Sequence, residues 1–161
     1  MSGPVQSLRA SPAVGLGGMY ATGAGEDNPV TIAARRPPFI EHQRWILEPV
    51  NTGLGSENTV QVLLAGDPSL AWTVQRGVDS EADGAKVLLL PRGGPEVTTW
   101  VKRPVSGAEN TFTLSVLNEL IGATWYAGSN KETNEVVIKV IPVIANPEEP
   151  PYWVGQPANE D

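Results

Sequence analysis

The stretch QRWIL, at residues 43–47, is the best starting point for the architecture of this chain, because a similar frame returns twice. The two further copies are TTWVK at 98–102 and PYWVG at 151–155. Successive copies lie 55 and 53 residues apart, and their tryptophans are Trp45, Trp100 and Trp153. Self-similarity at a nearly constant period predicts a fold built from equivalent units.

A second aromatic series supports the same division of the chain. Tyr20, Trp72 and Trp125 lie 52 and 53 residues apart, in the frames MYAT, AWTV and TWYA. Within each unit the two aromatic residues are separated by 25, 28 and 28 residues. We therefore expect one series to mark the second strand of each unit and the tryptophan series to mark the fourth.

The strands themselves are predicted from short β-branched or aromatic runs, separated by turn residues from a pool of 17 glycines and 15 prolines. Residues 113–122 also place leucines at helical spacing, but Phe112, Val116 and the threonines favour a strand there. The predicted strands are 5–10, 18–22, 29–33, 43–50, 59–65, 70–76, 85–91, 98–104, 111–117, 123–128, 135–141 and 152–155.

Twelve strands in three units of four predict an all-β β-trefoil, in which six strands close a barrel and three hairpins cover one end. Barrel closure leaves few free strand edges. We expect a single domain over 1–161, with repeats at about 1–53, 54–106 and 107–161 and an acidic, proline-rich tail from about 156. The alternative is a β-sandwich, which predicts no common spacing.

Composition restricts the partners of the chain. Eleven Lys and Arg against 18 Asp and Glu give a net charge of −7, which repels nucleic acid and anionic membranes. There are no cysteines, so disulfides and thiolate metal sites are excluded. The opening residues lack the pattern of a secretory leader. We expect a soluble, cytoplasmic monomer.

Residues for catalysis are scarce. His42 is the one histidine, there is no cysteine, and a Gly-x-Ser-x-Gly elbow is absent. The acidic groups at 26–27, 79–83 and 148–149 fall in predicted loops and are better explained as solvated turns than as a hydrolytic pair. A lone imidazole does not make a metal site. The sequence therefore predicts neither an enzyme nor a cofactor.

The predicted loops are better suited to protein recognition. In RRPPF, Pro37 and Pro38 restrict the backbone and hold Phe39 as a possible anchor for a partner's cleft, although Phe39 could equally fold back over the barrel. Lys131, in a predicted hairpin turn, could enter an acidic pocket or remain a solvated lysine.

Four segments carry a resemblance to a known family, namely GGMYAT (17–22), NPVTIAA (28–34), HQRWIL (42–47) and VVIKVIPVIANPEEPPYWV (136–154). They resemble the mushroom mycocypins, the clitocypin and macrocypin inhibitors of cysteine proteases. The similarity is clearest over about residues 15–50 and 135–155. The resemblance implies a β-trefoil without catalytic residues that blocks papain-like proteases.

The same resemblance implies which residues touch the protease. Inhibition would come from two neighbouring loops, between the first and second and between the third and fourth strands. Relatives that also inhibit legumain use an asparagine between strands five and six, where this chain has Asp67, so legumain inhibition is not expected. The implied contact residues are Val14, Gly15, Leu16, Gly17, Gly18, Pro37, Pro38, Phe39 and Glu41.

Two alternatives remain open. Other mushroom trefoils inhibit trypsin-like serine proteases through one substrate-like loop, for which Lys131 or Asn28 would be the reactive residue, Asn28 being followed by the unfavourable Pro29. Trefoil lectins of the ricin-B type usually carry Gln-x-Trp in each repeat, and only Gln43 and Trp45 satisfy it here. Fold alone does not separate these functions.

Overall fold

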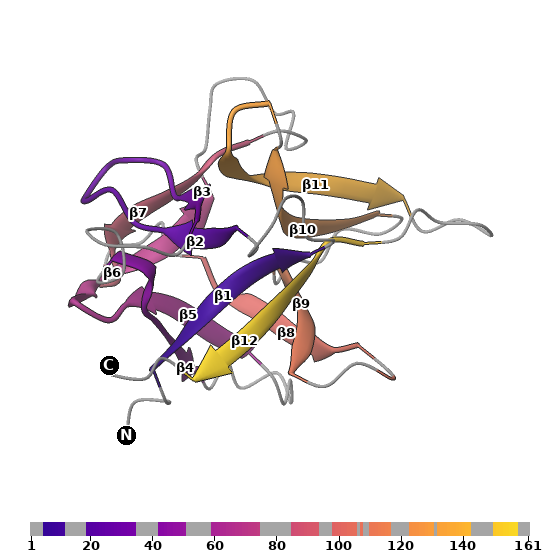
Figure 1. The fold of residues 1–161 in the computed structure, drawn as a ribbon, viewed down its shortest axis with the longest axis horizontal. Helices are drawn as coiled ribbons and strands as arrows, with labels where there is room; N and C mark the ends of the chain where they lie inside the picture. The colour runs from indigo at the N-terminus through magenta and orange to yellow at the C-terminus, as the bar shows by residue number, and fades with distance from the viewer. Residues whose placement is uncertain are drawn as a thin grey trace.

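The structure is a computed structural model that describes residues 5–11, 19–34, 42–50, 59–74, 85–93, 98–105, 107, 110–116, 123–130, 132–142 and 150–157. These residues form twelve strands (Figure 1). The strands are β1 (Val5–Ser11), β2 (Tyr20–Thr22), β3 (Thr31–Ala33), β4 (Trp45–Pro49), β5 (Thr59–Leu64), β6 (Asp67–Val74), β7 (Val87–Pro91), β8 (Trp100–Pro104), β9 (Thr111–Val116), β10 (Ala123–Asn130), β11 (Glu135–Pro142) and β12 (Tyr152–Pro157).

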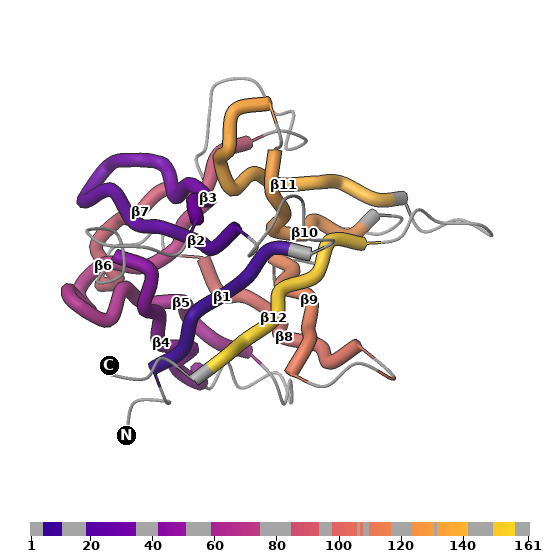
Figure 2. Tube along the Cα trace, in the orientation of Figure 1, coloured from indigo at the N-terminus to yellow at the C-terminus, as the bar shows by residue number. Residues whose placement is uncertain are grey.

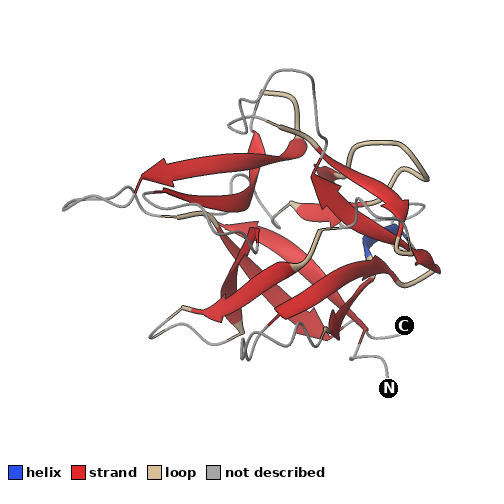
Figure 3. Cartoon of the chain, turned by 180° about the vertical axis from the view of Figure 1, so that it is seen from behind, coloured by secondary structure: helices blue, strands red, loops and turns tan. Residues whose placement is uncertain are grey.

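The prediction of an all-β chain is confirmed for the described residues. Their only helical feature is a short 3₁₀ turn at His42 and Gln43, drawn in blue in Figure 3. Of residues 113–122, where a helix competed in the sequence, 113–116 lie in strand β9, and 117–122 lie outside the described part. No helix of the described chain is long and apolar enough to cross a membrane.

The hydrogen-bonded pairs close into rings. The shorter ring joins six strands in the order β1, β4, β5, β8, β9 and β12, and returns to β1. A longer ring of nine strands passes through β10, β11, β3 and β2 and leaves β12, β6 and β7 outside. In Figure 2 the indigo β1 runs beside the yellow β12, where the six-strand ring closes.

The same pairing scheme occurs three times along the chain. In each group of four consecutive strands, the first pairs with the fourth and the second pairs with the third. The β2–β3, β6–β7 and β10–β11 pairs therefore occupy corresponding positions. This agrees with the three units predicted from the tryptophan spacing.

The three repeated tryptophans have equivalent surroundings. Each is fully buried, and each indole Nε1 donates a hydrogen bond to a backbone carbonyl in the second strand of its own group. A buried indole N–H needs such an acceptor. The bonds run from Trp45 to Ala21 (2.9 Å), from Trp100 to Trp72 (3.2 Å) and from Trp153 to Ala127 (3.0 Å).

Trp72 occupies the centre of this arrangement. Its ring meets those of Trp45, Trp100 and Trp153 edge-on, with centroids 5.4, 6.2 and 5.5 Å away. The Trp72 carbonyl accepts the indole bond of Trp100, and in the other two units the corresponding acceptors are the carbonyls of Ala21 and Ala127. These two alanines are therefore the counterparts of Trp72, and both are completely buried. One indole and two methyl groups thus fill the point where the three units meet.

The second aromatic series marks the second strand of each unit, as predicted, because Tyr20 lies in β2, Trp72 in β6 and Trp125 in β10. Its three members do not, however, occupy equivalent positions. Tyr20 directly precedes Ala21, and the half-buried Trp125 lies two residues before Ala127, so neither matches Trp72. The physical reason is space, because a point shared by three units holds one large side chain and not three.

Candidate functional site

The residues that the sequence predicts to contact a protease lie outside the described part of the chain. The same holds for Lys131. The described segments on either side of these residues, however, show where the two predicted loops are attached. The contact residues concerned are Val14, Gly15, Leu16, Gly17, Gly18, Pro37, Pro38, Phe39 and Glu41.

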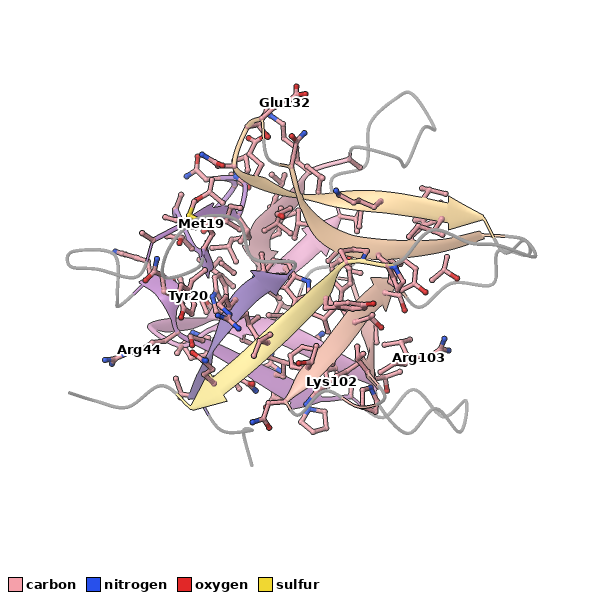
Figure 4. All side chains as sticks on the ribbon, turned by 45° about the vertical axis from the view of Figure 1, so that its right-hand side comes forward. Met19, Tyr20, Arg44, Lys102, Arg103 and Glu132 are labelled. Atoms are coloured by element: carbon pink, nitrogen blue, oxygen red, sulfur yellow. The ribbon has the colours of Figure 1, made fainter. Side chains whose placement is uncertain are left out.

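Both predicted loops are attached to strand β2 and its neighbours. The chain re-enters the described part at Met19, whose carbonyl accepts a hydrogen bond from the amide of Ala10 at 2.9 Å. The next residue, Tyr20, pairs with Arg9 on one side and with Ala33 on the other. Figure 4 labels Met19 and Tyr20 at this point. Since the second loop follows Ala33 almost immediately, the two attachment points are adjacent.

Gln43 connects these attachment points from inside the protein. Its side chain is buried, and its Nε2 lies 3.1 Å from the Thr22 hydroxyl, 3.3 Å from the Ala33 carbonyl and 3.1 Å from the Ala34 carbonyl. The Thr22 hydroxyl in turn donates to the carbonyl of Tyr20 at 2.9 Å. One amide thus joins the two ends of the second loop to the strand that follows the first.

A backbone bond strengthens the same junction. The amide of Gly23 donates to the carbonyl of His42 at 2.8 Å. A Cβ at Gly23 would meet side-chain atoms of Leu89, Leu64 and Trp45 at 3.1, 3.3 and 3.4 Å, so a larger residue there would require these side chains to shift by a few tenths of an ångström. The junction is therefore tightly packed.

Catalytic chemistry is not supported at this junction. His42 contributes a backbone carbonyl here, and its side chain is exposed, as expected for a rim histidine. Glu26 and Asp27 are exposed turn residues. The described residues contain no group of three histidine, cysteine, aspartate or glutamate side chains able to hold a metal ion.

The model of the family described as "Peptidase inhibitor clitocypin" matches residues 5–154 of the chain, which is nearly its whole length. The chain belongs to the clitocypin family of peptidase inhibitors. No individual curated protein matches it. As a member of an inhibitor family, it is not an enzyme, and its partner is a protease.

In this clitocypin-family inhibitor, the Asn28 side chain is bound to its own loop. Its Nδ2 lies 3.0 Å from the Ala24 carbonyl and 3.2 Å from the Glu26 carbonyl. The backbone is fixed as well, because Asp27 donates to the carbonyl of Leu89 at 2.8 Å and the Leu89 amide donates to Asn28 at 3.2 Å. Entry of Asn28 into a protease pocket would break both side-chain bonds, which disfavours it as a reactive residue.

The Asp67 side chain of the clitocypin-family chain also forms its hydrogen bonds within its own turn. It begins β6 in an exposed turn, where its Oδ1 accepts from the Ser69 hydroxyl at 2.5 Å and from the Ser69 amide at 3.3 Å. A side chain at the neighbouring Gly66 would meet no atom within 4 Å. The turn thus projects freely and presents a carboxylate.

The hairpin around Lys131 is well anchored at its described ends. The Asn130 carbonyl accepts from the Asn134 amide at 2.7 Å, and Asn130 Oδ1 accepts from the Glu132 amide at 2.9 Å. Glu132 is exposed and extends from the tip of the hairpin (Figure 4). At the base, Lys86 and Glu135 form an ion pair of 3.5 Å.

The Gln-x-Trp motif does not supply a sugar site in this family member. Gln43 and Trp45 are both buried, and both donate to backbone carbonyls. Sequence reasoning recorded this motif but missed the bridging role of Gln43. The available signal was its position, two residues before a repeated tryptophan and at the end of a predicted loop.

Proposed function

We propose that this chain is a single-domain β-trefoil that inhibits papain-like cysteine proteases by inserting residues 14–18 and 37–41 into the active-site cleft. The trefoil is supported by the six-strand ring and by the pairing scheme that recurs three times. The family match supports inhibition of a peptidase.

One observation carries the two-loop mechanism. Tyr20, which follows the first loop, pairs directly with Ala33, which precedes the second. Paired Cα atoms of neighbouring strands lie about 5 Å apart, so the two loops start close enough to enter a single cleft. Glycines at 15, 17 and 18 allow close approach of the first loop, and Pro37 and Pro38 stiffen the second.

The test is titration of papain and trypsin with the protein, using small peptide substrates. Gly17→Glu introduces a charge into the proposed contact and is expected to raise the inhibition constant for papain about 100-fold, since an unpaired interfacial charge costs several kcal/mol. Lys131→Ala is the matched control, with an unchanged constant for papain.

The outcomes separate the two classes of target. Trypsin inhibition that disappears in Lys131→Ala would replace the proposal by a serine protease inhibitor. Papain inhibition that is unaffected by Gly17→Glu would refute the two-loop mechanism.

A further inference from the structure

We propose that Gln43 is a positioning residue for inhibition, which acts from inside the protein by holding the attachment points of both loops in their binding geometry. The inference rests on the proposed function and extends it to a residue that no protease can touch, because Gln43 is 1% exposed.

The hydrogen bonds fix the direction of the amide. The Thr22 hydroxyl donates its proton to the Tyr20 carbonyl, so its oxygen is free to accept from Gln43 Nε2. The other neighbours of Nε2 are the Ala33 and Ala34 carbonyls, which are acceptors only. If the amide were flipped, its oxygen would face both carbonyl oxygens and could accept no hydrogen bond from them. The Nε2 donor therefore faces the loop ends. The resulting series of hydrogen bonds runs from Ala34 through Gln43 and Thr22 to Tyr20.

The corresponding positions in the other two units lack this connection. The residue two places before each repeated tryptophan is Gln43, Thr98 or Pro151. The Thr98 hydroxyl accepts one bond, from the Val74 amide at 2.9 Å, and proline has no side-chain donor. The glutamine side chain thus occurs in the unit whose strands carry both predicted inhibitory loops.

Only the nitrogen of the Gln43 amide is hydrogen-bonded among the described residues. Gln43 Oε1 is buried and has no donor among the described residues. A buried acceptor without a partner lowers stability; an apolar side chain of similar size would avoid that loss but would leave the Thr22, Ala33 and Ala34 oxygens without the Nε2 donor. What the amide supplies is the link between segments, and fixing them before association reduces the ordering cost of binding.

The chain offers a matched control for the experiment. Thr22 and Thr73 are both buried, and each hydroxyl donates to the carbonyl two residues earlier, at 2.9 and 3.1 Å. Thr22 also accepts from Gln43, whereas Thr73 lies in β6, in a unit without the proposed loops. Thr22→Val and Thr73→Val therefore remove similar bonds with similar changes in shape.

The experiment compares papain inhibition by the wild-type protein and by Gln43→Leu, Thr22→Val and Thr73→Val, at a temperature where denaturant unfolding shows all four to be folded. Gln43→Leu and Thr22→Val are expected to raise the inhibition constant about tenfold, corresponding to one or two lost hydrogen bonds, and Thr73→Val less than about twofold. Amide exchange at Gly23, which is bonded to His42, should accelerate in the first two variants alone.

Equal inhibition constants for Thr22→Val and Thr73→Val would overturn the inference, as would an unchanged constant for folded Gln43→Leu. Failure of the wild-type protein to inhibit papain would instead refute the proposed function on which the inference rests. The wild-type measurement therefore distinguishes the two failures.

Discussion

Moving the central indole from one unit to another tests the symmetry of the core directly. Trp72→Ala removes a ring that meets three other indoles, at centroid distances of 5.4 to 6.2 Å. Truncation of a buried aromatic residue costs about 3–5 kcal/mol. The Trp72 N–H has no acceptor among the described residues, and removing it returns about 1–3 kcal/mol. The expected loss is therefore about 2 kcal/mol, within a range of about 0–4 kcal/mol.

Ala127→Trp alone is expected to overpack the core, whereas Trp72→Ala leaves a cavity. Ala127 is fully buried and corresponds to Trp72, so a second indole would enter a space that is already occupied. Overpacking by a few methylenes costs about 1–3 kcal/mol, and a whole ring costs more. The double variant Trp72→Ala/Ala127→Trp restores one indole to the centre. We expect its stability to lie within about 2 kcal/mol of the wild type.

Urea unfolding followed by circular dichroism measures all four proteins, with the coupling free energy taken from the double-mutant cycle. A double variant that loses the sum of the two single losses, or more, would refute the idea that the units share one central position. The interpretation also requires equal denaturant slopes, because a changed slope signals an altered unfolded state.

Three further predictions follow from local contacts. Gly23→Ala places a methyl group 3.1 Å from Leu89 and should lower the free energy of unfolding by about 1–3 kcal/mol, whereas Gly66→Ala, with open space around it, should lower it by less than about 0.5 kcal/mol in the same urea titration. Asn28→Ala removes two side-chain bonds and should cost about 1 kcal/mol by thermal unfolding; a loss of papain inhibition in the folded variant would contradict the assignment of Asn28 to loop structure. Asp67→Asn keeps an oxygen for the turn and should leave stability unchanged within about 0.5 kcal/mol; assays should show it inhibiting legumain, which the wild type is not expected to do, and the absence of that gain would argue against the role of this turn.

The strand pattern could be read from the sequence because each strand is a short run with its own turn signals. The strand predicted at 111–117 is observed over Thr111–Val116, the part of it that the structure describes, and β10 extends two residues beyond its predicted end because the Asn130–Glu135 pair continues the hairpin. The repeat of Trp45 also predicted equivalent burial correctly. Spacing could not reveal that Trp72 has alanine counterparts, since that follows from the limited room at a shared centre.

The site is predicted less completely than the fold. Gly17 and Phe39 lie outside the described residues, so their contact roles stay predictions. Asn28 was a candidate by residue type and position, but its carbonyl partners are set by the folded loop. The bridging role of Gln43 depends on the carbonyls of Ala33 and Ala34 meeting Thr22, and no local pattern encodes that meeting.

The closure of the barrel by β1 and β12 has a kinetic consequence. Six residue pairs join these strands, and the hydroxyl of Ser7 reaches the carbonyl of Gln156 across 149 positions of the chain. Contacts between such distant residues slow folding, because their loop-closure entropy is lost before the contact forms. We therefore expect the edge of β1 that pairs with β12 to stay unpaired during synthesis until β12 has been made, and an unpaired strand edge favours aggregation.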